Sequence, residues 1–207
     1  MFSNQAYLQA YPDVAAAVNA GTFSSGLEHY TLYGQYENRI GIFLGSSGND
    51  TVTGFGKGTK LIAGVGFDTL LNGSTVAGVG EVDTLIGTEG TDIFALGHPS
   101  LPQLPSVSQQ FYVGGGNSDY ALIKDFERFN DIIVLEGAPQ NYNLQVINES
   151  ANIFTASGDL VGIVEGVKRL SIVSSDSVDI TKFNIPFTTS GEFSIVAFGA
   201  SIFRLAA

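Results

Sequence analysis

Apolar and polar residues alternate in short runs over the second half of the chain, which predicts a series of β-strands. From residue 111 onward the runs are rich in β-branched and aromatic residues, which favour strands. Turn residues separate them, as at 148–150 and 157–159. We expect seven strands in this half: 120–126, 131–135, 142–147, 152–155, 160–165, 170–173 and 193–198.

The first part of the chain predicts short helices instead. Pro12 suits the first position of one helix, and Gly21 suits the residue after its end. A second helix is expected to start at Ser25, where Glu28 completes a capping box, and to end at Gly34.

The aromatic residues of the second helix predict a packing face. They recur at every third position: Tyr30, Tyr33 and Tyr36. His29 is adjacent to them and has no second histidine nearby, so we expect it to be structural. His98 stands in a Pro-rich stretch, 98–110, and is expected to be a solvated loop residue.

Between the predicted helices and strands, the chain contains four degenerate copies of one short sequence repeat. In each copy glycine precedes an aspartate, and an apolar residue follows two places after the aspartate. Glycine permits tight turns that bring carbonyl oxygens together. A nonapeptide of this kind is the signature of a calcium-binding parallel β-roll. The copies lie at 45–53, 64–70, 80–85 and 87–95.

The spacing of the aspartates predicts where calcium binds. Two units make one coil of a roll, so Asp50 and Asp68, 18 residues apart, share a face. Asp83 and Asp92, nine residues apart, lie on opposite faces and are further candidate ligands. Calcium takes about six to eight oxygen ligands. We expect it between the turns 45–50 and 63–68, bound by the carboxylates of Asp50 and Asp68 and by carbonyl groups near Ser46, Gly48, Gly64 and Gly66.

The repeat is also incomplete, which leaves a second interpretation open. Thr59 stands where the unit after Asp50 should carry an aspartate, and 15 residues separate Asp68 from Asp83. A roll held by apolar and Thr/Asn stacking, without an ion, fits the same sequence. In both interpretations the apolar position of each unit should be buried in a ladder: Val52, Leu70, Leu85 and Phe94.

Composition limits the classes of molecule that this chain is expected to bind. Nine basic and 20 acidic residues give a formal net charge of −11, which argues against nucleic acid and anionic membranes and suits cations. The absence of cysteine excludes disulfides and thiolate metal sites. No apolar run approaches the ~20 residues of a membrane span. Only 14% of the residues are charged, against about 25% in ordinary soluble domains, and this deficit favours surface buried between subunits.

Motifs for catalysis are missing from the sequence. It contains no H-E-x-x-H and no G-x-S-x-G motif, and Gly114-Gly-Gly116 is not followed by the Lys-Ser/Thr of a phosphate loop. Asp125 and Asp131 flank a loop, but no aromatic platform accompanies them. We therefore expect the protein not to be an enzyme.

Two segments resemble known extracellular proteins. The run YVGGGNSDYALIKDF at 112–126, with NDIIVL at 130–135, resembles the segment that follows the repeats in RTX (hemolysin-type) calcium-binding proteins. Residues 7–39 are similar to a small helical module that precedes such repeats in cyanobacterial surface proteins. The resemblance implies a secreted or cell-surface protein, exported without an N-terminal signal peptide. Residues 193–207 fit both an uncleaved signal for type I secretion and an ordinary closing hairpin.

Together these observations predict a mainly β fold and an extracellular role. We expect a helical module at 1–44, a degenerate β-roll at 45–97, a Pro-rich loop at 98–110 and a β-rich capping region at 111–207. The expected function is a secreted calcium-binding structural protein that self-assembles head-to-tail into a filament, sheath or surface layer. Residues 191–207, which are strongly apolar, would add a strand to the next subunit. The alternative is a soluble or surface-attached calcium-binding adhesin module that does not polymerise. Cell-surface polysaccharide is a further candidate partner.

Overall fold

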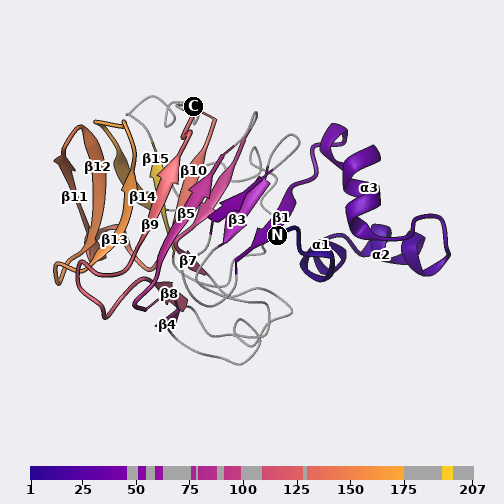
Figure 1. Ribbon diagram of the computed structural model, residues 1–207, viewed down its shortest axis with the longest axis horizontal. Helices are drawn as coiled ribbons and strands as arrows, with labels where there is room; N and C mark the ends of the chain where they lie inside the picture. The colour runs from indigo at the N-terminus through magenta and orange to yellow at the C-terminus, as the bar shows by residue number, and fades with distance from the viewer. Residues whose placement is uncertain are drawn as a thin grey trace.

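The chain was studied as a computed structural model, which describes residues 1–45, 51–54, 59–62, 76–77, 79–87, 91–98, 109–127, 130–174 and 193–197. This part of the chain is mostly β-sheet, with short helices gathered at one end beyond β1 (Figure 1). The predicted mainly β fold with a helical start is therefore confirmed. The helices are α1 (Asn4–Ala10), α2 (Pro12–Asn19), α3 (Gly26–Leu32) and the 3₁₀ turn η1 (Gly34–Tyr36).

Local signals place the helix ends. Helix α2 begins at Pro12, and Gly21, just after its end, has a φ of +76°, as expected of a glycine that follows a helix. The Ser25 hydroxyl accepts a hydrogen bond from the Glu28 backbone N–H at 3.1 Å and caps α3. The Glu28 carboxylate accepts from the Ser24 N–H at 2.6 Å instead of returning to Ser25, so the capping box is only half formed.

Two six-stranded sheets make up most of the fold. In the first, called sheet A, the strand order is β1-β3-β6-β10-β15-β14, and in the second, sheet B, it is β11-β12-β13-β9-β5-β2. The strands of sheet A are β1 (Gly41–Leu44), β3 (Thr59–Ile62), β6 (Ile93–Ala95), β10 (Ile132–Glu136), β14 (Ser171–Ser174) and β15 (Phe193–Ala197). Those of sheet B are β2 (Thr51–Thr53), β5 (Val82–Ile86), β9 (Tyr120–Lys124), β11 (Tyr142–Ile147), β12 (Ser150–Thr155) and β13 (Leu160–Val164).

The chain alternates between the two sheets. Strands β1, β3, β6 and β10 lie in sheet A, whereas β2, β5, β9 and β13 lie in sheet B, and each set pairs in parallel. Two antiparallel strands then extend each sheet, β15 and β14 in sheet A and β12 and β11 in sheet B. A small third sheet has the order β4-β8-β7, with bounds Val76–Ala77, Gln109–Phe111 and Gly97–His98. The 3₁₀ turn η2 (Pro139–Asn141) precedes β11.

The parallel strands carry a buried apolar row in each sheet. Val52 and Leu85 are register partners in sheet B, and Phe94 is in register with Leu61 and Ile133 in sheet A. All five side chains are buried in one core. The predicted burial of Val52, Leu85 and Phe94 is confirmed, but Phe94 belongs to the second row, so the single ladder is wrong. Leu70 lies outside the described residues.

Two expectations about individual residues, the packing of the tyrosines at 30–36 and the loop position of His98, are wrong. Tyr30 is buried, but Tyr33 and Tyr36 are 51% and 68% exposed. Helix α3 ends at Leu32, so the two later tyrosines fall outside its buried face. His98 is not a loop residue, because its backbone pairs with Gln109 where β7 meets β8. The prolines between these strands lie outside the described residues.

The predicted role of the C-terminal strand in strand addition is also corrected. Residues Phe193–Ala197 form β15, which pairs with β10 on one side and with β14 on the other, all within one chain. Both of its edges are therefore used, and this stretch cannot add to a neighbouring subunit while it is paired in this way. The reason is that sheet A extends with its own antiparallel strands. The rest of 191–207 lies outside the described residues.

Candidate metal site

Four aspartates connect the starts of neighbouring parallel strands. Each stands immediately before a strand and accepts a hydrogen bond from a backbone N–H at the start of the neighbouring strand or in the turn that precedes it. Asp92 accepts from Thr59 at 2.8 Å and Asp131 from Asp92 at 2.9 Å in sheet A. In sheet B, Asp119 accepts from Gly80 at 3.1 Å, and Asp159 accepts from Gly114 at 2.6 Å.

On the sheet A side the carboxylates have hydrogen-bond donors. Asp92 is fully buried, and its Oδ1 accepts both the N–H of Thr59 and, at 2.7 Å, the Thr59 hydroxyl. Asp131 accepts a second bond, from the Glu127 N–H at 2.7 Å. Burial raises the pKa of Asp131 to about 7, and the nearby charges of Asp92 and Glu127 add to the rise, whereas the two N–H bonds oppose it.

Raising the pH from about 5 to about 8 is therefore expected to lower the free energy of unfolding through Asp131. The pKa of this carboxyl is about 7 in the folded chain and ~3.9 in an unfolded one, so the folded state binds the proton more tightly. The resulting stability is complete below about pH 4 and is lost as the pH rises through about 7. At ~1.4 kcal/mol for each pKa unit, the loss is at most about 4 kcal/mol.

Denaturant titrations across this pH range test the expectation. Asp131→Asn cannot titrate, so this variant should show a shallower fall in stability with pH than the unmodified protein. Parallel curves for the two proteins would show that Asp131 does not carry the pH dependence.

The sheet B side contains a carboxylate oxygen without a donor. Asp119 is fully buried, and its Oδ2 accepts from Gly80, but its Oδ1 has no hydrogen-bond partner among the described residues. Glu81 lies beside it in register, because the following residues, Val82 and Tyr120, are paired. A buried, uncompensated carboxylate oxygen costs free energy, and such an atom calls for a ligand such as an ion or a water molecule.

Glycine makes room for this carboxylate. A Cβ at position 115 would collide with the carboxyl group of Asp119, so only glycine fits there. The flanking Gly114 and Gly116 have φ values of +116° and +70°, which other residues rarely adopt. The turn 114–116 therefore packs directly against the Asp119 side chain. The backbone carbonyl groups of this turn belong to the same part of the structure.

The structure separates the predicted ligands Asp83 and Asp92. Asp83 lies on β5 in sheet B, is fully buried and accepts a hydrogen bond from the Tyr112 hydroxyl at 2.7 Å. Asp92 precedes β6 in sheet A, so the two lie on different sheets, in line with the expected opposite faces. The described residues hold no group of three or more His, Asp or Glu side chains arranged for a metal. Six predicted ligand positions lie outside the described residues: Ser46, Gly48, Asp50, Gly64, Gly66 and Asp68.

Sequence reasoning did not select Asp119, Asp131 or Asp159 as site residues. One signal was present, because Asp119 and Asp159 immediately precede predicted strands, Asp131 is the first residue of one, and three glycines at 114–116 stand shortly before Asp119. The missing information was the register between strands, which decides that each carboxylate reaches the turn before the neighbouring strand.

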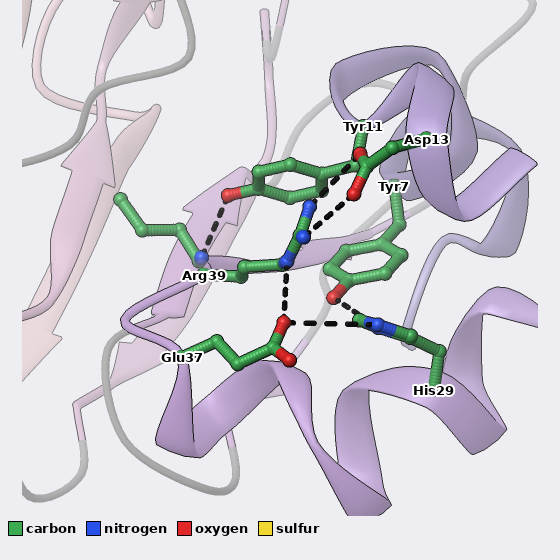
Figure 2. A network of polar contacts seen from close by, with 7 residues as sticks. Tyr7, Tyr11, Asp13, His29, Glu37 and Arg39 are labelled. Carbon is green, nitrogen blue, oxygen red and sulfur yellow. Dashed lines mark hydrogen bonds and ion pairs between the residues drawn. The ribbon is translucent and has the colours of Figure 1, made fainter.

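A second polar cluster joins the helices to β1 (Figure 2). Arg39 donates to both carboxylate oxygens of Asp13, at 3.0 and 2.7 Å, and to Glu37 at 2.8 Å. Its guanidinium lies over the ring of Tyr11, 5.0 Å from the centroid. The Tyr11 hydroxyl in turn accepts from the Ile40 N–H at 2.8 Å. Because this residue immediately precedes β1, the cluster fixes the helices to the first strand.

His29 belongs to the same cluster and has a packing role. Its Nδ1 lies 3.1 Å from the Tyr7 hydroxyl, and its Nε2 lies 3.8 Å from Glu37. Burial lowers the pKa of His29, and the charge of Arg39 lowers it further, which favours the neutral ring near neutral pH. Since these groups bind one another, we assign the cluster to stability, not to a ligand site.

Comparison with known proteins identifies no family for this chain. The chain matches none of the protein-family models and none of the curated proteins with which it was compared. In the described residues, no helix is long and apolar enough to cross a membrane. The function therefore has to be argued from the geometry of the turns.

Proposed function

We propose that this chain is an extracellular calcium-binding β-roll that serves as a structural protein. The observation that carries the proposal is the buried Oδ1 of Asp119, which has no partner in the described residues and lies against a glycine turn. An ion there would compensate the charge that the fold otherwise leaves buried. Calcium suits the available ligands, because it prefers carboxylate and carbonyl oxygens and the chain has a net charge of −11 and no cysteine.

The order of the strands supports a roll. Successive strands alternate between two parallel sheets, and each sheet contributes an apolar row to one core. Aspartates precede parallel strands in both sheets and bond backbone N–H groups of the neighbouring strands or turns. In this interpretation the antiparallel strands β14 and β15 of sheet A, and β11 and β12 of sheet B, are the capping region at the far end of the roll.

Asp119, with carbonyl groups of the adjoining turns and Glu81 beside it, would hold the ion. When bound, calcium would supply positive charge between two neighbouring turns and so fix their spacing. Residues 45–50 and 63–68 carry a similar sequence pattern of glycines followed by an aspartate, and we propose them as a second calcium site with Asp50 and Asp68 as carboxylate ligands.

Thermal unfolding with calcium and with a chelator tests the Asp119 site. An ion that binds only the folded chain adds about 2.7 kcal/mol at a hundredfold excess over Kd, so calcium should raise the melting temperature. Asp119→Asn should reduce that increase. Glu165→Gln is the matched control, because Glu165 is an exposed carboxylate that pairs with Lys124 at the end of β9 opposite to Asp119, and this variant should respond to calcium like the unmodified protein.

Two results would count against this proposal in different ways. An increase of equal size in Asp119→Asn would place calcium elsewhere in the chain. Identical melting of the unmodified protein in calcium and in chelator would exclude a stabilising calcium ion altogether.

Self-assembly into a filament, sheath or surface layer is the second part of the proposal. The low charged fraction of 14% supports it, because a surface with few charges favours contact between copies. The specific observation in favour of the alternative, a calcium-binding adhesin module that does not polymerise, is that β15 pairs within its own chain. Measurement of the particle mass in solution distinguishes the two.

A further inference from the structure

Strand β11 leaves one edge of sheet B open. It pairs with β12 on one side, and no other strand of the described chain pairs with its outer side. The strand lies at the end of the molecule opposite the helices (Figure 1). Val146 and Ile147 near its end are 57% and 43% exposed. An exposed edge with apolar side chains is a site where another strand can add.

The turn that follows β11 shows which backbone groups face outward. Asn148 and Glu149 have φ values of +48° and +64°, as in a two-residue type I′ hairpin turn. Ile147 and Ser150, which flank the turn, then form a hydrogen-bonded pair, and bonded pairs alternate with non-bonded ones along the strands. The N–H and C=O groups of Leu144 and Val146 therefore point away from β12, toward the open edge.

Within the described residues, this edge has none of the usual protection. Native sheets protect edges with charged residues, proline, bulges or a covering segment. Strand β11 contains no charged residue and no proline, and its pairing with β12 is regular over all six of its residues. By contrast, β1 at the edge of sheet A is covered, because Phe2 bridges Phe43 and the Ser3 N–H donates to Ile42 at 2.7 Å.

We propose that the open edge of β11 binds β11 of a second copy of this chain. The inference rests on the self-assembly part of the proposed function, of which a two-fold pair would be the first unit, and it does not depend on calcium. Growth of such pairs into a filament or layer would require a second contact on another surface. An antiparallel strand edge is complementary to itself, so a two-fold axis at Gln145 places Leu144 of each copy opposite Val146 of the other. Four backbone hydrogen bonds then form between outward groups. The partner is a second copy because this strand is uncharged in a chain of net charge −11, so the paired strands of two copies would meet without like charges between them.

The proposal predicts a closed dimer. A two-fold contact uses the same surface on both copies and therefore ends at two. Light scattering after size-exclusion chromatography should give twice the chain mass of 21.8 kDa at micromolar concentrations. Val146→Pro removes an outward N–H without removing a bond to β12 and should weaken the dimer roughly tenfold to a hundredfold.

Two further variants separate this effect from unfolding. Val146→Lys places a charge at the edge and should also give monomers, which decides the question if Val146→Pro fails to fold. Val79→Lys is the matched control, because Val79 is 51% exposed in the turn before β5, away from β11, and this variant should remain a dimer. Circular dichroism and melting curves verify that each variant is folded.

Three outcomes would overturn the inference. If the unmodified protein is a monomer, both the β11 contact and the proposed self-assembly are wrong. If it associates but Val146→Lys has no effect, self-assembly stands and the contact lies elsewhere. Particles larger than a dimer that Val146→Lys converts directly to monomers would show that the contact is head-to-tail and not two-fold.

Discussion

Replacing Phe94 by alanine is expected to lower the free energy of unfolding by about 3–5 kcal/mol. Phe94 is completely buried in the centre of sheet A, in register with Leu61 on one side and Ile133 on the other. Its ring also packs against Phe126, with 5.9 Å between the centroids. These neighbours are fixed by their strands, so they cannot collapse into the space that the ring leaves.

Chemical denaturation measures this loss, and Tyr36→Ala provides the comparison. Tyr36 is an aromatic residue of similar size at the end of η1 that is 68% exposed, so its removal should change stability by about 0.5 kcal/mol or less. A loss of similar, small size in both variants would mean that Phe94 is not part of the core and that the register of sheet A is different.

Replacing Asp92 by alanine is expected to cost about 2–5 kcal/mol. The Asp92 carboxylate accepts the N–H and the hydroxyl of Thr59, and all of these groups are buried. The alanine variant leaves both donors without a partner and also leaves a space beside them. Since the loss comes from hydrogen bonds within the protein, a chelator should not change its size.

Asp159→Ala is the matched control for Asp92. The Asp159 carboxylate accepts the N–H of Gly114 in an exposed turn, where water can replace it, so the cost should be only about 0.5–1.5 kcal/mol. If the two variants lose equal stability, burial does not set the strength of these contacts. If the effect of Asp92→Ala disappears in chelator, Asp92 acts through a bound ion instead.

The sequence predicts those elements that depend on local patterns. Strand β11 occupies the expected residues 142–147, and the positive φ values at Asn148 and Glu149 agree with the expected turn. Pro12 and Gly21 mark the ends of α2 because both residues act through their own backbone dihedral angles. Such signals are carried by neighbouring residues, so they remain readable without the rest of the fold.

Contacts between distant residues could not be predicted in this way. The composition of residues 193–198 predicts a strand. The position of β15 between β10 and β14, however, depends on residues far away in the sequence. The exposure of Tyr33 follows from the end of α3 at Leu32, which a spacing of three does not reveal.

The candidate site shows the same limit. An aspartate before a strand can bind a backbone N–H or an ion, and its sequence context is alike in both cases. Asp92 has two donors from Thr59, whereas Asp119 has one carboxylate oxygen without any described partner. Only the register between strands separates the two roles. The boundaries of the expected β-roll at residues 45 and 97 stay a prediction.

Anomalous diffraction from crystals grown with calcium tests the proposed ion site most directly. A calcium ion bound as proposed would give a peak about 2.3–2.6 Å from Oδ1 of Asp119, between the turn at Gly80 and the turn at 114–116. Crystals of Asp119→Asn grown in the same solution should lack that peak. A map of the unmodified protein with no peak beside Asp119, or with Oδ1 hydrogen-bonded to the protein, would contradict the proposed calcium site.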